Sequence, residues 1–216
     1  MGDPMSDEED LRLPADIMAL VETVKREKQE MEEKALMGES LPEEDWQLSQ
    51  FWYSEDTATR LCAEIEAISG LFSQLSVALV STPTLLPAIK KLPCFSTGKL
   101  KVHLFEKDTR FALLHPNEYV EFDLYHPEQI PECLCGIFDV VVADPPFLTE
   151  SCMAETAKAI RRLSSEGARI LICTGAVQED VVGREFGAHR LTFQPRHERN
   201  LSNNFAAFAN YDTLTL

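Results

Sequence analysis

The architecture of this chain can be predicted from one segment, Phe138-Asp139-Val140-Val141-Val142-Ala143-Asp144-Pro145-Pro146-Phe147. Its apolar run predicts a strand that is buried on both faces, as in a parallel sheet. The prolines cannot donate to a sheet ladder, so the strand should end before Pro145. Open α/β sheets bind ligands just beyond the carboxyl ends of their strands. We therefore expect Asp144, Pro145, Pro146 and Phe147 to border a ligand site.

Predicted strands and helices alternate on both sides of this segment. Strands are expected at 76–81, 99–106 and 118–123 before it, and at 168–174, 190–194 and 205–211 after it. Helices are expected at 54–69, 83–92, 127–134, 149–167 and 177–186, with Ser54, Thr82 and Thr149 as N-caps and Gly70, Gly167 and Gly187 at C-terminal ends. This alternation predicts a Rossmann-like α/β fold, a mostly parallel sheet of seven strands with helices on both faces. The tight connection before the last strand predicts an antiparallel hairpin at one edge.

The acidic residues are concentrated in the first part of the chain. The 216 residues include 20 basic and 36 acidic ones, for a net charge of −16, and residues 1–45 alone hold 15 acids and 5 bases. We expect 1–45 to be an acidic, partly disordered extension with one helix at 14–36, and 46–216 to be the α/β domain. An acidic body is poorly suited to gripping phosphate backbones, so stable nucleic-acid binding is not expected. It suits a basic protein partner better.

Cysteine usage and hydropathy indicate the compartment. The six cysteines contain no Cys-x-x-Cys pair, so reduced thiols are favoured over zinc ligands or disulfides, and we expect no metal. The amino terminus is acidic, unlike a secretory or transit signal. The most apolar stretch, 71–92, is interrupted by Pro83 and Pro87 and is too polar to span a membrane. These features predict a soluble protein of the cytoplasm, with the nucleus left open as a second location, and without membrane contacts.

An aromatic segment precedes the domain's first predicted helix, Trp46-Gln47-Leu48-Ser49-Gln50-Phe51-Trp52-Tyr53. Such a density of rings is typical of core or lid packing. The segment could also form a flap over a planar ligand, with the amide side chains orienting polar groups. The sequence leaves both interpretations open, with a slight preference for packing.

Acidic residues follow the second, third and fourth predicted strands. Glu106 or Asp108 matches the position at which nucleotide-binding folds place an acid against ribose hydroxyls. Asp123, followed by Leu124, could meet an adenine amino group. The loop after the first strand, with Ser81 and Thr82, has no glycine for close approach to phosphates. These residues predict an adenosine-shaped site without a pyrophosphate, which disfavours NAD and ATP and is compatible with S-adenosylmethionine.

The Asp-Pro-Pro-Phe motif is suited to a nitrogen nucleophile. The Asp144 carboxylate and the Pro145 carbonyl can both accept N–H groups from an amine and so orient its lone pair. A lysine must also lose a proton from a group of pKa about 10.4. Desolvation against the Phe147 ring lowers that pKa, and the ring attracts the cation beforehand.

These motifs together resemble the class I S-adenosylmethionine-dependent methyltransferases with an Asp/Asn-Pro-Pro-aromatic motif. More closely, the chain resembles the elongation factor 1A lysine methyltransferase 1 family, formerly described as N6-adenine-specific DNA methyltransferases. The matching segments lie between Trp46 and Asp212 and are 46–54, 105–111, 143–148, 171–176 and 195–201. The resemblance implies S-adenosylmethionine as cofactor and a lysine of elongation factor 1A as substrate.

Individual residues are also expected to have roles at the site. Gln50 and Tyr53 would join Ser81, Thr82, Glu106, Asp108, Asp123 and Leu124 at the cofactor, and Trp52, Phe147, Arg196 and His197 would meet the substrate. The loop that holds Arg196 and His197 could instead brace the rim of the pocket. Two other functions remain open: an adenine-N6 methyltransferase acting on DNA or RNA, and a cofactor-binding subunit without activity of its own. We expect a monomer.

Overall fold

The computed structural model of the chain describes residues 17–18, 22–23, 26, 41–199 and 204–216. The chain divides into two compact units, 1–42 and 43–216, and the fold described below is that of the second unit. Of the helix predicted at 14–36, residues 17–18, 22–23 and 26 are described and are helical. The rest of it falls outside the described residues, as do residues 200–203 of the polar loop.

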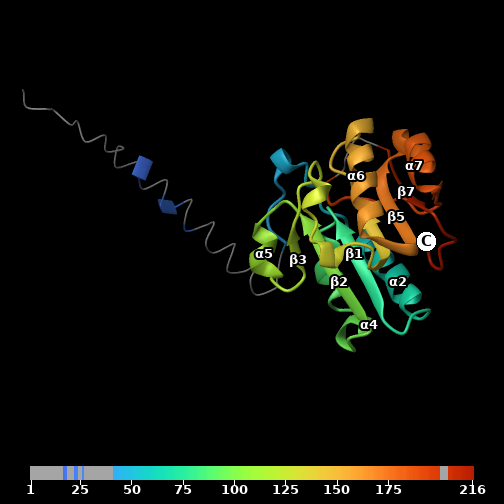
Figure 1. Cartoon of the computed structure of the whole chain (residues 1–216). Coiled ribbons are helices and arrows are strands. Elements are labelled where there is room, and N and C mark those ends of the chain that lie inside the picture. Colours follow the sequence, from blue (N-terminus) through green and yellow to red (C-terminus); the bar gives the residue numbers. More distant parts are fainter. Residues whose placement is uncertain (1–16, 19–21, 24–25, 27–40, 200–203) are drawn as a thin grey trace, which may run out of the picture. The chain divides into compact units, whose positions relative to one another are not determined.

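A seven-stranded sheet forms the centre of the second unit, in the order β3-β2-β1-β4-β5-β7-β6 (Figure 1). Its strands are β1 (Leu75–Val80), β2 (Leu100–Glu106), β3 (Tyr119–Glu121), β4 (Phe138–Ala143), β5 (Ser164–Gly175), β6 (His189–Arg190) and β7 (Phe205–Ala209). The first five strands pair in parallel, and β7 is antiparallel to both of its neighbours. The predicted α/β fold with an antiparallel last strand is confirmed.

The antiparallel hairpin that was predicted at one edge is formed by β6 and β7. β7 pairs with β5 as well as β6, so it is an inner strand, and the short β6 is the edge. The side chains explain this order: most of β7 is buried and apolar, whereas His189 and Arg190 are exposed. An apolar strand gains more from an inner position, where both of its faces are covered.

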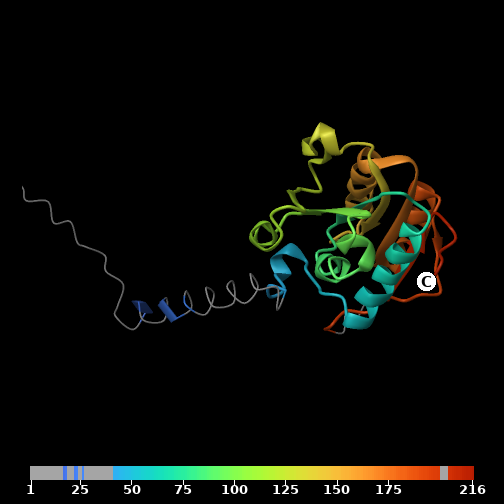
Figure 2. The same cartoon turned by 90° about the horizontal axis from the view of Figure 1, so that it is seen from below.

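Helices cover both faces of the sheet (Figure 2). α2 (Glu55–Ser69) packs with α3 (Leu85–Ile89) and α4 (Pro93–Ser96), and α6 (Glu150–Leu163) packs with α7 (Glu179–Phe186). The structure also contains α5 (Arg110–Leu114) and the 3-10 turns η1 (Trp46–Leu48), η2 (Pro127–Gln129), η3 (Glu132–Leu134) and η4 (Ala176–Gln178). Ser54 and Thr149 cap α2 and α6 as predicted, by accepting from the backbone N–H of Thr57 and Cys152.

Three predicted helices differ from the structure. The helix expected at 127–134 is replaced by the two 3-10 turns η2 and η3. Thr82 does not cap a helix, because α3 begins only after Thr84 and has no side-chain cap. α6 ends at Leu163 rather than near Gly167, and Gly167 instead lies in the first part of β5 with a φ of +74°. The β4–β5 register shifts at this place, and glycine tolerates the left-handed backbone there.

The end of the chain is fastened to α2 by a buried carboxylate. Glu64 accepts hydrogen bonds from the backbone N–H of Leu214 at 3.0 Å and of Thr215 at 2.7 Å, and from the Thr215 hydroxyl at 2.8 Å. A buried carboxylate is tolerated because these donors replace its hydration.

The described part of the chain has no helix long and apolar enough to cross a bilayer. It likewise contains no group of three or more metal-ligating side chains placed to hold a metal ion.

Candidate active site

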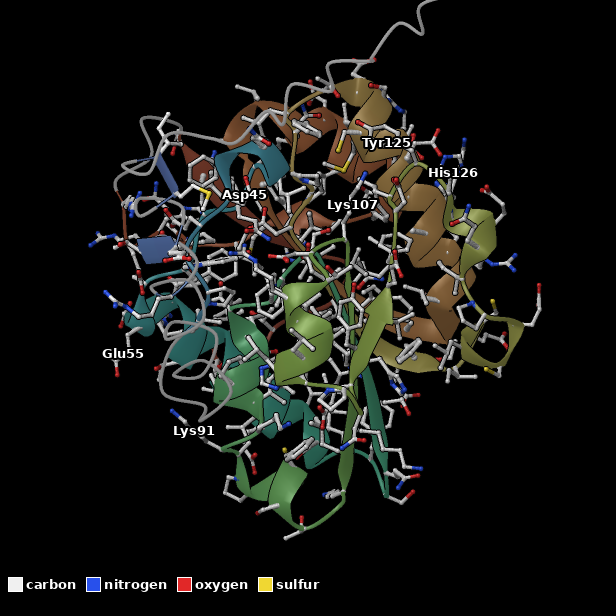
Figure 3. The ribbon with its side chains drawn as sticks, turned by 90° about the vertical axis from the view of Figure 1, so that its left-hand side faces the viewer. Asp45, Glu55, Lys91, Lys107, Tyr125 and His126 are labelled. Atoms are coloured by element: carbon white, nitrogen blue, oxygen red, sulfur yellow. The ribbon has the colours of Figure 1, made fainter. Side chains whose placement is uncertain are left out.

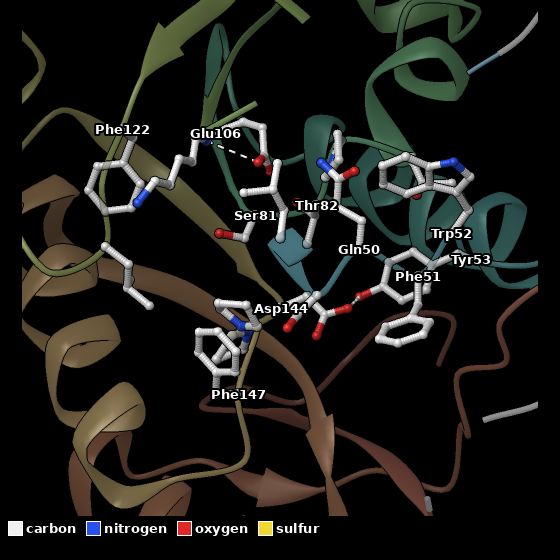
Figure 4. Close-up of a pocket in the computed structure, with 18 of the residues that line it drawn as sticks. Gln50, Phe51, Trp52, Tyr53, Ser81, Thr82, Glu106, Phe122, Asp144 and Phe147 are labelled. Carbon is white, nitrogen blue, oxygen red and sulfur yellow. Dashed lines mark hydrogen bonds between the residues drawn. The ribbon is translucent and has the colours of Figure 1, made fainter. Parts of the chain in front are cut away.

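A cavity of about 250 Å³ lies at the carboxyl ends of β1, β2 and β4 (Figure 4). Its lining comes from residues 47–53, 81–84, 106–107, 122–125 and 144–148, together with His197 and Phe205. The strand ends that were predicted to share one site therefore do so, and the aromatic segment before α2 lies against them.

Glu106 is the carboxylate of the β2 side. It is buried, and its Oε1 accepts from the backbone N–H of Lys107 at 2.9 Å and of Asp108 at 3.1 Å. Burial raises the pKa of Glu106 to about 7, although the two backbone bonds act against this rise. Because both bonds go to Oε1, a ligand that donates hydroxyl groups would meet Oε2.

The turn after β1 brings two hydroxyl residues to the cavity. Ser81 has a φ of +53°, a left-handed conformation that is unfavourable for a residue with a side chain. Thr82 is buried, and its Oγ1 has no hydrogen-bond partner among the described residues. A strained turn and an orphaned buried hydroxyl at one cavity wall indicate that this wall is built to meet a ligand.

Asp123 is paired rather than free. Its Oδ2 accepts from Lys107 Nζ at 2.9 Å and its Oδ1 from the Tyr125 backbone N–H at 3.0 Å, and the Lys107 hydrogen bond in particular lowers the pKa of Asp123. Lys107 and Tyr125 lie near each other on this side of the molecule (Figure 3). Lys107 was not predicted as a site residue, although it directly follows Glu106 in the sequence. Leu124 also lines the cavity.

Asp108 is not part of the lining. It is buried and accepts from Gln50 Nε2 at 2.9 Å and from Arg110 NH2 at 2.7 Å. Burial raises the pKa of Asp108, but the Arg110 and Gln50 hydrogen bonds outweigh it and hold the pKa below its usual value. The structure therefore moves Asp108 from a direct cofactor contact to a support for Gln50, which does line the cavity.

Asp144 and the prolines form the opposite wall, at the end of β4. The Tyr53 hydroxyl donates to Asp144 Oδ2 at 2.6 Å (Figure 4). Burial raises the pKa of Asp144 to about 7, against the lowering effect of this hydrogen bond. Phe147 is 42% exposed at the rim. Tyr53 was predicted at the cofactor, and its hydroxyl instead contacts the Asp-Pro-Pro-Phe motif.

A short antiparallel ladder ties the aromatic segment to the loop after β6. The Ser54 N–H donates to the Arg196 carbonyl and the Glu198 N–H to the Trp52 carbonyl, both at 2.9 Å, on either side of a Tyr53–His197 bridge. Arg196 is exposed and outside the lining, so the structure gives it a bracing role through its backbone rather than a place in the cavity.

His197 and Trp52 line the cavity but are also packed. The buried His197 ring lies edge-on to Phe205, with centroids 4.6 Å apart, and burial lowers the pKa of His197 to about 4. It is therefore neutral near pH 7. Trp52 is buried and lies edge-on to Phe111 at 6.0 Å. The two interpretations of the aromatic segment are thus compatible, since its rings pack and also enclose the cavity.

The polar and apolar groups of this cavity fit a nucleoside that carries no phosphate. A carboxylate for a diol, an unsatisfied hydroxyl and the apolar side chains of Phe122 and Leu124 line one end of the cavity. None of these groups is a glycine-rich phosphate cradle. Glu106, Ser81, Thr82 and Leu124 are accordingly the residues that could hold S-adenosylmethionine.

Comparisons with known proteins show the family to which the chain belongs. A family model described as "Probable N6-adenine methyltransferase" matches residues 44–213. The chain is 42% identical to the protein-lysine N-methyltransferase M142.8 of Caenorhabditis elegans, over 98% of this chain and 99% of that protein. It is 37% identical to human EEF1A lysine methyltransferase 1, over 97% of each. It is 34% identical to the protein-lysine N-methyltransferase EFM5 of Saccharomyces cerevisiae, over 93% of this chain and 92% of that protein.

Among solved structures, the branched-chain polyamine synthase of Thermus thermophilus superposes with a TM-score of 0.58 at 15% identity. The match covers 83% of this chain and 62% of that one. At this identity the likeness concerns the fold alone.

Proposed function

We propose that this chain, which belongs to the family described as "Probable N6-adenine methyltransferase", methylates a lysine of translation elongation factor 1A with S-adenosylmethionine. The proposal is supported by its relatives, which are named as protein-lysine N-methyltransferases. The observation that carries this function is the position of Asp144 and Pro145, which share one cavity with Glu106 at the carboxyl edge of the sheet. An acceptor site and a nucleoside site are thereby placed side by side.

Residues at the β1 and β2 ends would hold the cofactor. Glu106 would accept hydrogen bonds from the ribose hydroxyls, and Thr82 would gain the partner that its buried hydroxyl lacks. Phe122 and Leu124 would cover the adenine ring. When bound, S-adenosylmethionine supplies an electrophilic methyl group.

Asp144 and Pro145 would orient the acceptor. The carboxylate and the Pro145 carbonyl accept the two N–H groups of a neutral amine, which aims its lone pair in one direction. The lysine arrives as an ammonium ion, attracted by Asp144 and by the exposed face of Phe147. Desolvation then lowers the pKa of the amine, so that it loses one proton to water, while Asp144 stays ionised and accepts an N–H group.

Charge supports a protein substrate over a nucleic acid. With a net charge of −16, the chain would repel a phosphate backbone and attract a basic protein surface. We propose that it acts as a monomer in the cytoplasm, where translation factors work, without stable binding to nucleic acid.

A transfer assay tests this function. The full chain is incubated with radiolabelled S-adenosylmethionine and, separately, with unmethylated elongation factor 1A or with adenine-containing DNA or RNA. We expect label on the protein alone, on a single lysine that mass spectrometry identifies, and no label when that lysine is replaced by arginine. Asp144→Ala should abolish the transfer while cofactor binding survives, and Glu128→Ala, at an exposed position in η2, should behave as wild type.

The same assay decides the second candidate. The family description favours an adenine-N6 methyltransferase, which would use the same Asp-Pro-Pro-Phe acceptors on a flipped base. Label in nucleic acid and none in the protein would establish that activity instead. Cofactor binding without any transfer would indicate a subunit that depends on a partner.

A further inference from the structure

The hydrogen bond between Tyr53 and Asp144 joins two parts of the site that are 91 residues apart in sequence. We propose that Tyr53 is a positioning residue, which holds Asp144 with Oδ2 occupied and Oδ1 turned to the acceptor amine. This assignment rests on the proposed methyl transfer to an amine, and it differs from the cofactor contact that the sequence suggested for Tyr53.

The geometry of the contact favours this role. The Tyr53 hydroxyl donates to Oδ2 at 2.6 Å, a length typical of an O–H donor on an ionised carboxylate. A carboxylate that is held through one oxygen cannot rotate freely about its last side-chain bond. The hydroxyl therefore selects which oxygen the substrate meets, and it does so before the substrate arrives.

Tyr53 is itself held in place from two sides. Its backbone is bridged to His197, between the Ser54–Arg196 and Trp52–Glu198 hydrogen bonds. Its ring lies 5.3 Å from the His197 ring. A donor on a fixed backbone with a packed ring keeps its direction, which is the property that a supporting residue needs.

Few other titratable groups face this pair. Among the described residues, Cys173 of β5 approaches both Tyr53 and Asp144, and burial raises the pKa of its thiol well above the usual value, so the thiol stays neutral. His197 faces the Tyr53 ring and is neutral near pH 7 because burial lowers its pKa. Tyr53 is thus the group that stabilises the ionised form of Asp144 by hydrogen bonding.

Tyr53→Phe removes this hydrogen bond and keeps the ring. The lost donor should raise the pKa of Asp144 by about one unit, as expected for a hydrogen bond to a charged group. The acidic limb of the kcat profile should move to higher pH by the same amount, and kcat at pH 7 should fall about fivefold from the lost ionisation alone. The KM for S-adenosylmethionine should stay within about twofold of wild type, because Glu106 and the β1 turn are untouched.

Tyr211→Phe is the matched control. Its hydroxyl is also buried, but it belongs to a residue beyond β7 that does not line the cavity. We expect this variant to keep the wild-type pH profile, kcat and KM. A fall in kcat common to both variants would reflect a general loss of packing and would overturn the assignment.

A second readout does not depend on activity. The carboxyl carbon of Asp144 can be followed by NMR in cofactor-free protein with 13C-labelled aspartate, and its signal is identified by its loss in Asp144→Asn. Its titration midpoint should lie about one pH unit higher in Tyr53→Phe than in wild type or Tyr211→Phe. An unchanged midpoint would overturn the positioning role, as would a raised KM for S-adenosylmethionine with kcat unchanged.

The two readouts separate this assignment from the proposed function. If wild type methylates no lysine, the proposed function fails, while the NMR midpoints still report whether Tyr53 controls Asp144. If wild type is active and the midpoints do not move, the positioning role alone is wrong.

Discussion

Gly175 touches Leu148: a β-carbon built on Gly175 would lie 2.9 Å from both methyl groups of the Leu148 side chain. The same loop is held by Gln178, whose Nε2 donates to the Leu148 carbonyl at 2.9 Å. The end of β5 and the η4 turn therefore pack against the loop after β4 and hold it in place. Leu148 directly follows Phe147, so this support fixes one wall of the acceptor site.

Gly175→Ala should displace Leu148 and, with it, Phe147. We expect KM for the protein substrate to rise several-fold and kcat to fall, and the free energy of unfolding to drop by about 1–3 kcal/mol, as is usual for overpacking. Steady-state kinetics and urea unfolding measure the two effects. Gly183→Ala in α7 is the control, because its nearest contact would be an ordinary 3.7 Å. Wild-type kinetics in Gly175→Ala would show that the loop tolerates the shift.

Asp144→Asn should remove activity and also remove part of the pH dependence of stability. The folded-state pKa of Asp144 is raised to about 7, so this group stabilises the fold below the unfolded pKa, and that contribution is lost as the pH rises through 7. Asparagine carries no charge at any of these pH values. The Tm of Asp144→Asn relative to wild type should therefore be higher at pH 8.5 than at pH 5, by about 5 °C. Calorimetry at both pH values checks this, and an equal difference at both would contradict it.

Glu106→Gln should abolish a pH dependence of ligand binding. In the cofactor-free protein the pKa of Glu106 is about 7 because of burial, whereas a bound diol needs the ionised form as acceptor. Affinity should therefore rise with pH up to about 7.5 and then level off in wild type. S-adenosylhomocysteine is the suitable probe, since it has no sulfonium charge to sense Asp144. Titration calorimetry at pH 6 and 8 should show a weaker and nearly pH-independent affinity in the variant. A slope that persists in Glu106→Gln would assign the titration to another group.

Glu64→Gln should weaken the attachment of the chain end to α2. The amide keeps one acceptor oxygen but turns an N–H₂ group toward the Leu214 and Thr215 backbone donors. We expect a loss of about 2–4 kcal/mol in the free energy of unfolding, because hydrogen bonds to a buried charge are replaced by a mismatch. Urea unfolding measures it, with the exposed Glu55→Gln as the control. Kinetic constants should stay at wild-type values, because Glu64 is not part of the cavity lining.

The sheet could be predicted from sequence because its strands are local signals. β1, β2 and β4 are short apolar runs that end in polar residues or proline, and their bounds agree with the expected ones within one residue at each end. The inner position of β7 could not be predicted, because it depends on the pairing of β7 with β5, which is distant in sequence. Gly167 shows a second limit. A glycine after a helical pattern predicts a helix end, but β5 begins at Ser164 and includes Gly167.

The acids of the site were also predictable, because parallel strands bring their carboxyl ends to one edge. This is why Glu106, Asp123 and Asp144 meet in one cavity. The roles of Asp108 and Tyr53 were not predictable in this way. Both depend on how the segment before α2 folds across the sheet, which brings Gln50 to Asp108 and Tyr53 to Asp144 over 58 and 91 residues. The aromatic density of that segment was the one available signal, and it did not reveal the partners.

The ladder between residues 52–54 and 196–198 makes the segment before α2 a part of the active site. A shortened chain that starts at Glu55 would keep every strand of the sheet, and it would lack the hydroxyl that reaches Asp144 and the amide that reaches Asp108. It would also lack the N-cap of α2 and the buried rings of Trp52 and Tyr53. Domain boundaries chosen from the sheet alone would therefore cut through the active site.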